Sequence, residues 1–253
     1  MSDVKEAVRQ QFEAAAERYR TSAVHAQGED LPALVAAAAL TGTESVLDAG
    51  CGAGHASLAV APHAAAVTAL DLSDAMLGQV QRLAQDRGAN NVRTQRGDVE
   101  QMPFEGGAFE VAISRYSAHH WPNPAAALRE LYRVLKPGGR FVLSDIVAPS
   151  APALDTYLQT VELLRDPSHV RDHTVDQWLQ MFSAAGLQAE VVYEWRVALD
   201  FLPWLERIGT PQQNAAMIAA LLNGAPSEVR AELEWHDRGT FALRGALFRA
   251  IRR

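Results

Sequence analysis

An acidic residue, three closely spaced glycines and the start of a helix follow one another in the first quarter of the chain. Residues 46–55 (VLDAGCGAGH) predict a buried strand that runs into a glycine-rich turn and then into a helix. Because glycine has no Cβ, backbone N–H groups and the positive end of the helix can approach a bound ligand there. The carboxylate of Asp48 disfavours an anion beside it and favours a ligand with an ammonium group. The alternative is a tight turn with a solvated Asp48.

Two further acids follow at spacings that suit a nucleoside. A dinucleotide site would prefer G-x-G-x-x-G, whereas this turn has G-x-G-x-G. Asp71 ends the next predicted strand 21 positions after Gly50, close to the ~20 expected of an acid that binds ribose hydroxyls. After the third predicted strand, Asp98 could accept the exocyclic amine of an adenine while Val99 packs beside its ring. Asp98 as a simple turn former is the alternative. S-adenosyl-L-methionine (SAM) carries the ammonium group that would suit Asp48.

The elements that must position these residues alternate regularly up to about residue 150. Short apolar runs at 45–48, 66–71, 91–96, 108–114 and 140–147 predict buried strands, because they are bounded by Gly, Asp or Asn and are rich in β-branched or aromatic residues. Helical spacing follows them, for example after Ser73, a predicted N-cap, and up to a stop at 136–139 (KPGG). Strands separated by helices predict a parallel sheet covered on both faces.

Beyond residue 150 the alternation weakens. Helical segments near 154–164, 175–185, 202–208, 212–222 and 227–235 surround two further predicted strands, 188–199 and 240–251. We therefore expect the end of the chain to complete the sheet and to add a helical cap over the ligand crevice at the strands' carboxyl ends. The helical segment 4–19 is too polar for a core and could belong to the same lid.

Composition excludes several classes of protein. The chain has 253 residues and a formal charge of -7, and it has no block of Lys and Arg, so nucleic acid is not expected as a partner. The apolar run 31–40 is about half the ~20 residues that span a bilayer, and the polar start does not resemble a secretory signal, so we expect a cytoplasmic protein. The single cysteine, Cys51, excludes an internal disulfide framework and a multi-cysteine metal site.

Together these motifs resemble the class I SAM-dependent methyltransferases, in the branch that includes the ubiquinone/menaquinone C-methyltransferases. Residues 47–54 (LDAGCGAG) look like motif I and 70–73 (LDLS) like motif II. Residues 97–99 (GDV) with 102–104 (MPF) look like the adenine loop, and 135–139 (LKPGG) like the turn before strand five. More narrowly, 22–28 (SAVHAQG), 114–121 (SRYSAHHW) and 166–172 (DPSHVRD) resemble the uncharacterised bacterial YafE-type group over nearly the full length.

The resemblance implies a Rossmann-like α/β fold: a seven-stranded class I methyltransferase sheet whose last strand is antiparallel, with helical cap insertions. We expect one domain over residues 1–253, made of an N-terminal helical lid (1–40), a SAM-binding core (41–147), and a cap that also completes the sheet (148–253). The family positions assign residues to each portion of the cofactor. They are Asp48, Gly50 and Gly52 for methionine, Asp71 and Leu72 for ribose, Asp98 and Val99 for adenine, Arg115 at the methionine end, and Cys51 as a small motif residue with a structural role.

The resemblance also suggests that Tyr19 and His25 fold over the methionine end of the cofactor and exclude water, with Ser22 as a weaker candidate. A surface helix with an incidental tyrosine is the alternative. If the acceptor is a hydroxyl or an acidic C–H, His120 or His119 just past the fourth strand could act as a base. Otherwise one of these histidines packs below the methionine site and the other faces water. The near alternation of His169, Arg171 and His173 favours a polar strip or a solvated loop over a metal site, so no metal is expected.

We therefore expect a SAM-dependent methyltransferase that moves a methyl group to carbon or oxygen of a small, largely apolar organic acceptor. The signature of nucleic-acid amine methylases after strand four is replaced by Ser114-Arg115-Tyr116-Ser117, which agrees with the absence of a nucleic-acid partner. A homodimer is left open. Two rival functions also remain: an NAD-dependent oxidoreductase on the same sheet, and a SAM-binding sensor or partner protein without chemistry.

Overall fold

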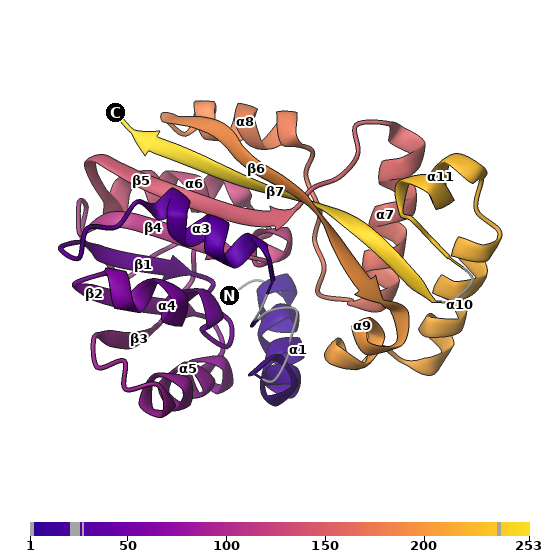
Figure 1. Ribbon diagram of the computed structural model, residues 1–253, viewed down its shortest axis with the longest axis horizontal. Coiled ribbons are helices and arrows are strands. Elements are labelled where there is room, and N and C mark those ends of the chain that lie inside the picture. Colours follow the sequence, from indigo (N-terminus) through magenta and orange to yellow (C-terminus); the bar gives the residue numbers. More distant parts are fainter. Residues whose placement is uncertain (1–2, 21–25, 27, 237–238) are drawn as a thin grey trace.

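A single twisted sheet runs through the whole protein (Figure 1). The computed structural model describes residues 3–20, 26, 28–236 and 239–253. Within these residues the sheet has seven strands in the order β3-β2-β1-β4-β5-β7-β6. The strands are β1 (Ser45–Ala49), β2 (Ala66–Asp71), β3 (Val92–Arg96), β4 (Phe109–Arg115), β5 (Leu135–Ile146), β6 (Leu187–Asp200) and β7 (Thr240–Arg252).

The first five strands are parallel, and the last is not. Asp48 of β1 pairs in parallel register with Ala69 of β2 on one side and with Ile113 of β4 on the other. Since the order of strands reverses between β1 and β4, their carboxyl ends open the crevice where doubly wound sheets bind ligands. β7 lies antiparallel to both β5 and β6. The seven-stranded sheet with an antiparallel last strand is thus confirmed.

One boundary differs from the sequence prediction. Helical spacing predicts a helix that continues through Leu135 to the KPGG stop, whereas α6 (Pro124–Val134) ends one residue earlier and Leu135 already pairs with Phe109 of β4. The register then shifts before Val111 pairs with Arg140. Cross-strand pairing therefore begins before the glycines, and the proline that follows could not have continued the helix.

Helices cover both faces of the sheet. On one face, α6 and α8 (Val175–Ala184) pack Leu128, Leu131 and Phe182 against Phe141 and Phe248 of the sheet. On the other face lie α3 (Asp30–Ala38), α4 (His55–Val60) and the short turn η1 (Ala61–His63), whose buried side chains include Leu34, Ala38 and Val60. α5 (Asp74–Asp86) packs through Leu77 and Val80 beside α4. This two-sided burial explains the nearly continuous apolar runs of the inner strands.

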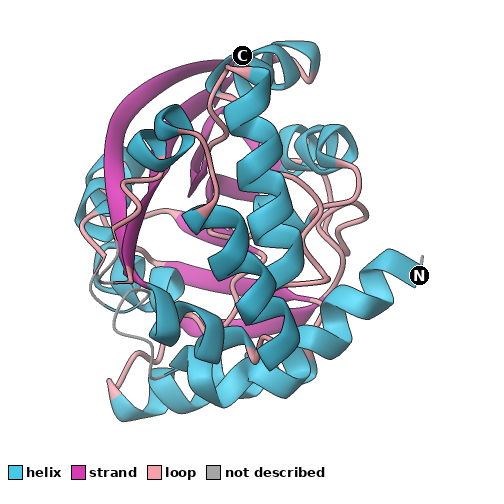
Figure 2. Ribbon diagram, turned by 90° about the vertical axis from the view of Figure 1, so that its right-hand side faces the viewer, coloured by secondary structure: helices cyan, strands magenta, loops and turns pink. Residues whose placement is uncertain are grey.

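The predicted helical cap gathers around the far ends of β6 and β7 (Figures 1 and 2). It consists of α7 (Pro152–Arg165), α9 (Phe201–Ile208), α10 (Gln212–Asn223) and α11 (Ser227–Glu232). Its own apolar core includes Leu158, Trp204, Ile218, Val229 and Phe241.

The first helix, α1 (Asp3–Arg20), bridges the two regions. It contacts α5 at the sheet and α9 in the cap, and Figure 1 shows it between them. The side chain of Gln11 donates to the carbonyl of Ile208 at 2.9 Å, and Arg18 Nε donates to the carbonyl of Arg207 at 3.0 Å. Across the described ranges, no helix is long and apolar enough to cross a membrane.

Candidate active site

A cavity of about 1000 Å³, partly open to solvent, lies at the carboxyl ends of β1, β2 and β4. It brings together nearly all of the predicted cofactor residues: Tyr19, Asp48, Gly50, Cys51, Gly52, Asp71, Leu72, Asp98, Val99 and Arg115. His120 also lines it. His25 and Ser22 fall outside the described residues.

The two glycines of the turn have different structural roles. Gly50 has a φ of 72°, and a Cβ added there would lie 2.0 Å from Ser117 Oγ, so the close approach of the next loop requires glycine. Gly52 has a φ of 51°, but an added Cβ would meet no protein atom within 4 Å. Because Gly52 lines the cavity, its missing side chain leaves room for a ligand to approach the backbone.

The end of β2 is tied to this turn through Asp71. Its carboxylate accepts hydrogen bonds of 2.9 Å from the backbone N–H groups of Gly52 and Ser73. Burial raises the pKa of Asp71, and these backbone donors oppose the shift. The spacing between the glycine turn and Asp71 therefore reflects a direct contact, and the carboxylate stands at the cavity wall with room to accept further hydrogen bonds.

Asp48 is the most buried acid that lines the cavity, and only one of its two carboxylate oxygens has a hydrogen-bond partner among the described residues. Oδ2 accepts a 2.5 Å hydrogen bond from Ser57 Oγ, while the buried Oδ1 has no hydrogen-bond partner within the described chain. Burial raises the pKa of Asp48 to about 7, against the opposing effect of Ser57. A buried carboxylate oxygen without a partner is costly. An ammonium group in the cavity would satisfy Oδ1, so the residues present fit the amino acid portion of SAM.

At the other end of the cavity, α1 reaches the predicted adenine loop. Lys5 Nζ lies 2.6 Å from Asp98 Oδ2 and 2.5 Å from Glu100 Oε2. The other oxygen of Asp98 accepts the backbone N–H of Glu100 at 2.9 Å. Val99 is buried beside it. Asp98 is thus both the predicted adenine acceptor and an attachment point for the first helix.

Arg115 and Cys51 have structural contacts. The guanidinium of Arg115 donates to both oxygens of the buried Asp30, at 2.6 and 2.8 Å, which fixes the start of α3 to the end of β4. Ser144 donates to the same carboxylate at 2.8 Å. Burial raises the pKa of the Cys51 thiol well above its usual value, so little reactive thiolate is present near neutral pH.

The first helix lines one wall of the cavity, from Lys5 to Tyr19 at its carboxyl end. Tyr19 packs edge-on against Phe12, with ring centroids 5.4 Å apart, and the charge of Arg165 in the cap acts on its hydroxyl. His55 Nε2 donates to the carbonyl of Tyr19 at 3.0 Å. Phe12 also contacts the ring of His120, at 4.8 Å. The first helix therefore touches the cofactor cavity, the cap and the histidine turn at once.

His119 is held as a cation. It lies on the short turn η2 (Ala118–His120) after β4, with Nδ1 2.6 Å from Oδ1 of Asp145 at the end of β5. Oδ2 of Asp145 accepts the backbone N–H of Ala118 at 2.7 Å. Burial lowers the pKa of His119, but attraction to Asp145 and the hydrogen bond outweigh it and raise this pKa to about 9. His119 does not line the cofactor cavity.

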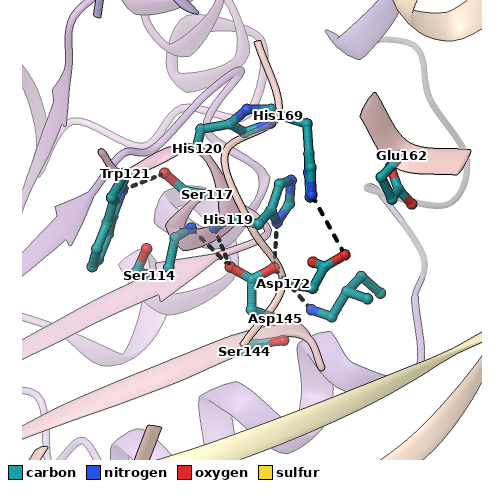
Figure 3. Close-up of polar contacts among 12 residues, drawn as sticks. Ser114, Ser117, His119, His120, Trp121, Ser144, Asp145, Glu162, His169 and Asp172 are labelled. Carbon is teal, nitrogen blue, oxygen red and sulfur yellow. Dashed lines mark hydrogen bonds and ion pairs between the residues drawn. The ribbon is translucent and has the colours of Figure 1, made fainter. Parts of the chain in front are cut away.

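His120 is held in the neutral form, beside that cation (Figure 3). Its Nδ1 donates to the carbonyl of Ser168 at 3.0 Å, which leaves Nε2 with the lone pair. Burial and the charge of His119 lower the pKa of His120 to about 4. Oδ2 of Asp166, buried and without a hydrogen-bond partner within the described chain, lies 4.0 Å from Nε2. Adjacent groups whose pKa values are driven apart are typical of acid–base sites.

A second cavity, of about 540 Å³, lies between η2 and the cap helices; we call it the cap cavity. It shares Tyr19, Tyr116 and His120 with the cofactor cavity. Its other lining residues are His119, Ile146, Glu162, Arg165, Asp172, Val197, Leu199, Trp204, Arg207 and Leu243.

The side chains of His169, Arg171 and His173 have different partners and do not meet at one site. His169 is buried beside His119 and His120 (Figure 3). Its Nε2 donates to Gln159 Oε1 at 3.1 Å. Arg171 pairs with Asp155 at 2.5 Å, and His173 packs on Trp178. Within the described part of the chain, no group of three or more His, Cys, Asp or Glu side chains is placed to hold a metal ion.

Sequence reasoning missed several polar residues that line these cavities or contact the histidines beside them, namely Lys5, Asp145, Glu162, Arg165, Asp166 and Arg207. Two signals were available. Asp145 is the second-last residue of β5, close to a strand end as Asp71 is at the end of β2. Glu162 and Arg165 fall at helical spacing on the same buried face as Leu158 and Val161, where charges are unusual. Lys5 and Arg207 carry no local signal, because their partners lie far away in the sequence.

Comparisons with known proteins agree with this geometry. A family model described as a methyltransferase domain matches residues 47–143. The uncharacterised methyltransferase YcgJ of Bacillus subtilis is 37% identical over 96% of this chain and 98% of its own, and its crystal structure superposes with a TM-score of 0.85, over 88% of this chain and 97% of that one. The uncharacterised protein YafE of Escherichia coli is 40% identical over 74% of this chain and 91% of its own.

A more distant structure shows the same fold with the cofactor bound. Geranyl diphosphate methyltransferase in complex with SAM superposes with a TM-score of 0.60 at 19% identity, over 88% of this chain and 84% of that one. The seven-stranded sheet, the cavity at its switch point and the full-length similarity to YcgJ all lead to one assignment. The chain belongs to the class I methyltransferases, whose cofactor is SAM.

Proposed function

We propose that this methyltransferase transfers the methyl group of SAM to a carbon or oxygen of a small organic acceptor bound in the cap cavity. One observation carries the proposal: Tyr19, Tyr116 and His120 line both the cofactor cavity and the cap cavity. The cavities therefore adjoin at the methionine end of the first, where the methyl group of the cofactor would face the second.

The cofactor residues follow from the cavity walls. Asp48 would pair with the ammonium group through its free Oδ1, next to the backbone of Gly50, Cys51 and Gly52. Asp71 and Leu72 would hold the ribose. Asp98 and Val99 would hold the adenine, and Arg115 would line the methionine end. SAM supplies a methyl group on a positively charged sulfur, a good leaving group.

The proposal gives His120 the role of base. The acceptor atom attacks the methyl carbon in line, the bond from that carbon to sulfur breaks with its electron pair left on sulfur, and the acceptor's proton passes to Nε2 of His120. Asp166, 4.0 Å away, would stabilise the imidazolium. His119 would hold its neighbour in the neutral form through its own charge. Positioning alone would suffice for an acceptor that has already lost its proton.

The first helix would exclude water from this junction. The packing of Tyr19 on Phe12 and the hydrogen bond from His55 to the carbonyl of Tyr19 support this role, and His25 would be a second lid residue. A dry site strengthens electrostatic interactions and prevents unproductive access of solvent.

The acceptor and the location complete the proposal. The many Ile, Val, Leu and Trp side chains of the cap cavity support an acceptor with an apolar body. The acidic charge of -7 supports the absence of a nucleic-acid partner, and the proposal places the enzyme in the cytoplasm.

A screen with methyl-labelled SAM tests the proposal. Small apolar acceptors with hydroxyl or acidic C–H groups are incubated with wild type and with His120→Asn, and label is followed into extracted products. Label should appear in a product with wild type, and at least about a hundredfold more slowly with His120→Asn. If the protein binds SAM yet labels no acceptor in broad panels and in metabolite extracts, the sensor without chemistry becomes the better account.

A further inference from the structure

The cap cavity contains an arginine, Arg207, that the proposed mechanism does not use. Arg207 of α9 lines this cavity, and its guanidinium makes no hydrogen bond or ion pair with any residue of the described chain. The backbone around it is fixed, since its carbonyl accepts from Arg18 at 3.0 Å. Burial and the nearby Arg165 lower its pKa. A half-buried cation without a carboxylate in contact loses solvation and recovers only part of it, here through the attraction of the more distant Glu162.

The other charged groups of the cavity are already compensated. Arg165 lies 3.5 Å from Glu162, donates to the carbonyl of Trp204 at 3.3 Å, and stacks on that ring at 4.7 Å. His119 is paired with Asp145. Asp166 approaches Arg165 and His120 from the loop after α7 and does not line the cavity.

One lining carboxyl group remains, that of Asp172. Its Oδ2 is buried without a hydrogen-bond partner in the described chain, 3.9 Å from His169 Nε2. Burial raises its pKa well above the usual value. As a neutral acid, Asp172 would not compensate Arg207, and it could donate a hydrogen bond. No carboxyl group on the described cavity wall therefore lies within ion-pair distance of the Arg207 guanidinium.

The rest of the lining is apolar, with Ile146, Val197, Leu199, Trp204 and Leu243. We propose that the cap cavity recognises a small organic acid, whose carboxylate pairs with Arg207 and whose apolar body packs on these side chains. The carboxylate orients the acceptor, and the atom to be methylated faces His120 at the junction with the cofactor cavity. This inference rests on the proposed function and names the class of acceptor.

Matched ligands test the charge requirement. Hexanoate, octanoate and phenylacetate are each titrated calorimetrically against their amides, with the protein saturated by S-adenosyl-L-homocysteine (SAH). We expect at least one acid to bind and its amide to bind about ten- to a hundredfold more weakly, as loss of a charge-assisted hydrogen bond would cause. Arg207→Gln should abolish the difference, and Arg207→Lys should restore part of it. Arg230→Gln, which removes an exposed arginine of the same cap, should behave as wild type.

SAH affinity separates the two proposals. It is measured first for every variant and should be unchanged in Arg207→Gln, because Arg207 does not line the cofactor cavity. Failure of wild type to bind SAH would contradict the proposed function. Normal SAH binding with no acid bound, with equal binding of acid and amide, or with acid binding that survives Arg207→Gln would overturn the role of Arg207.

Discussion

The Nδ1–H of His120 donates a hydrogen bond of 3.0 Å to the carbonyl oxygen of Ser168. A carbonyl only accepts, so this contact fixes the tautomer and leaves the lone pair on Nε2. Ser168 belongs to the loop after α7, so a segment of the cap fixes the tautomer of a residue on η2. Phe12 of α1 contacts the same ring. The possible base is thus assembled from three separate parts of the chain.

His120→Asn should separate catalysis from packing. The amide N–H of asparagine can replace the donor to Ser168, whereas nothing replaces Nε2. We expect the rate of methyl transfer to the acceptor found in the screen to fall at least about hundredfold, the usual contribution of a general base. SAH affinity and thermal stability should stay close to those of wild type. A variant with wild-type turnover would show that His120 only packs at the junction.

The His119–Asp145 pair should stabilise the fold in a pH-dependent way. The folded pKa of His119 is about 9, above the ~6.5 of an unfolded histidine. Its contribution is therefore fully present below pH of about 6.5 and is lost as the pH rises through about 9. We expect the difference in melting temperature between wild type and His119→Asn to be largest near pH 6 and to shrink by pH 10.

The comparison with the variant is needed because other groups titrate in the same range. Cys51, whose thiol is also harder to ionise in the folded protein, lowers the stability of both proteins alike as the pH rises. A wild-type advantage that stayed constant from pH 6 to 10 would contradict the charged state of His119.

We expect the cofactor to occupy the space beside Gly52, so that a side chain at this position prevents binding. Gly52→Val places a branched side chain in the cavity and forces a positive φ on a non-glycine residue. Gly88→Val provides the matched control, because Gly88 has a φ of 65° and no atom within 4 Å of an added Cβ, yet it does not line the cavity. Both variants should lose similar stability, but only Gly52→Val should lose SAM binding. Equal SAM affinity in the two folded variants would show that the glycine turn around Gly52 does not contact the cofactor.

The first helix should be protected by the cofactor. We expect chymotrypsin to cleave α1 near Phe12 and Tyr19 in the free protein and about a hundredfold more slowly at SAH concentrations near a hundred times the Kd. Lys5→Gln, which removes the contacts to Asp98 and Glu100, should speed cleavage of the free protein. Lys136→Gln, at an exposed pair with Glu110, should not. Cleavage at the same rate with and without SAH would show that α1 packs on the protein without responding to the cofactor.

The features that sequence predicted best are local or tied to strand ends. The glycine turn, Asp71 and the order of strands and helices could be predicted because each depends on residues adjacent in sequence or on a regular period. Asp71 accepts a hydrogen bond from Gly52, so the sequence spacing between the glycine turn and Asp71 corresponds to a contact in the fold. The sheet, the family and the cofactor followed from these features.

The acceptor side could not be predicted in this way. Arg207 reaches the cap cavity through the packing of α9, and Lys5 meets Asp98 across 93 positions of sequence. Likewise, the tautomer of His120 depends on Ser168, 48 positions away. Such contacts depend on tertiary packing and cannot be predicted from the spacing of residues along the sequence.

Calorimetric titration of the purified protein with SAM, SAH and NAD tests the central claim most directly. The free Oδ1 of Asp48, the open space at Gly52 and the carboxylate of Asp71 favour an ammonium-bearing nucleoside over a pyrophosphate. We predict one-to-one binding of SAM and SAH in the micromolar range and no measurable binding of NAD. Asp71→Ala should weaken SAM by about 1 to 3 kcal/mol, because ribose hydroxyls lose a charged acceptor. Absence of SAM binding, or NAD binding of similar strength, would contradict the account.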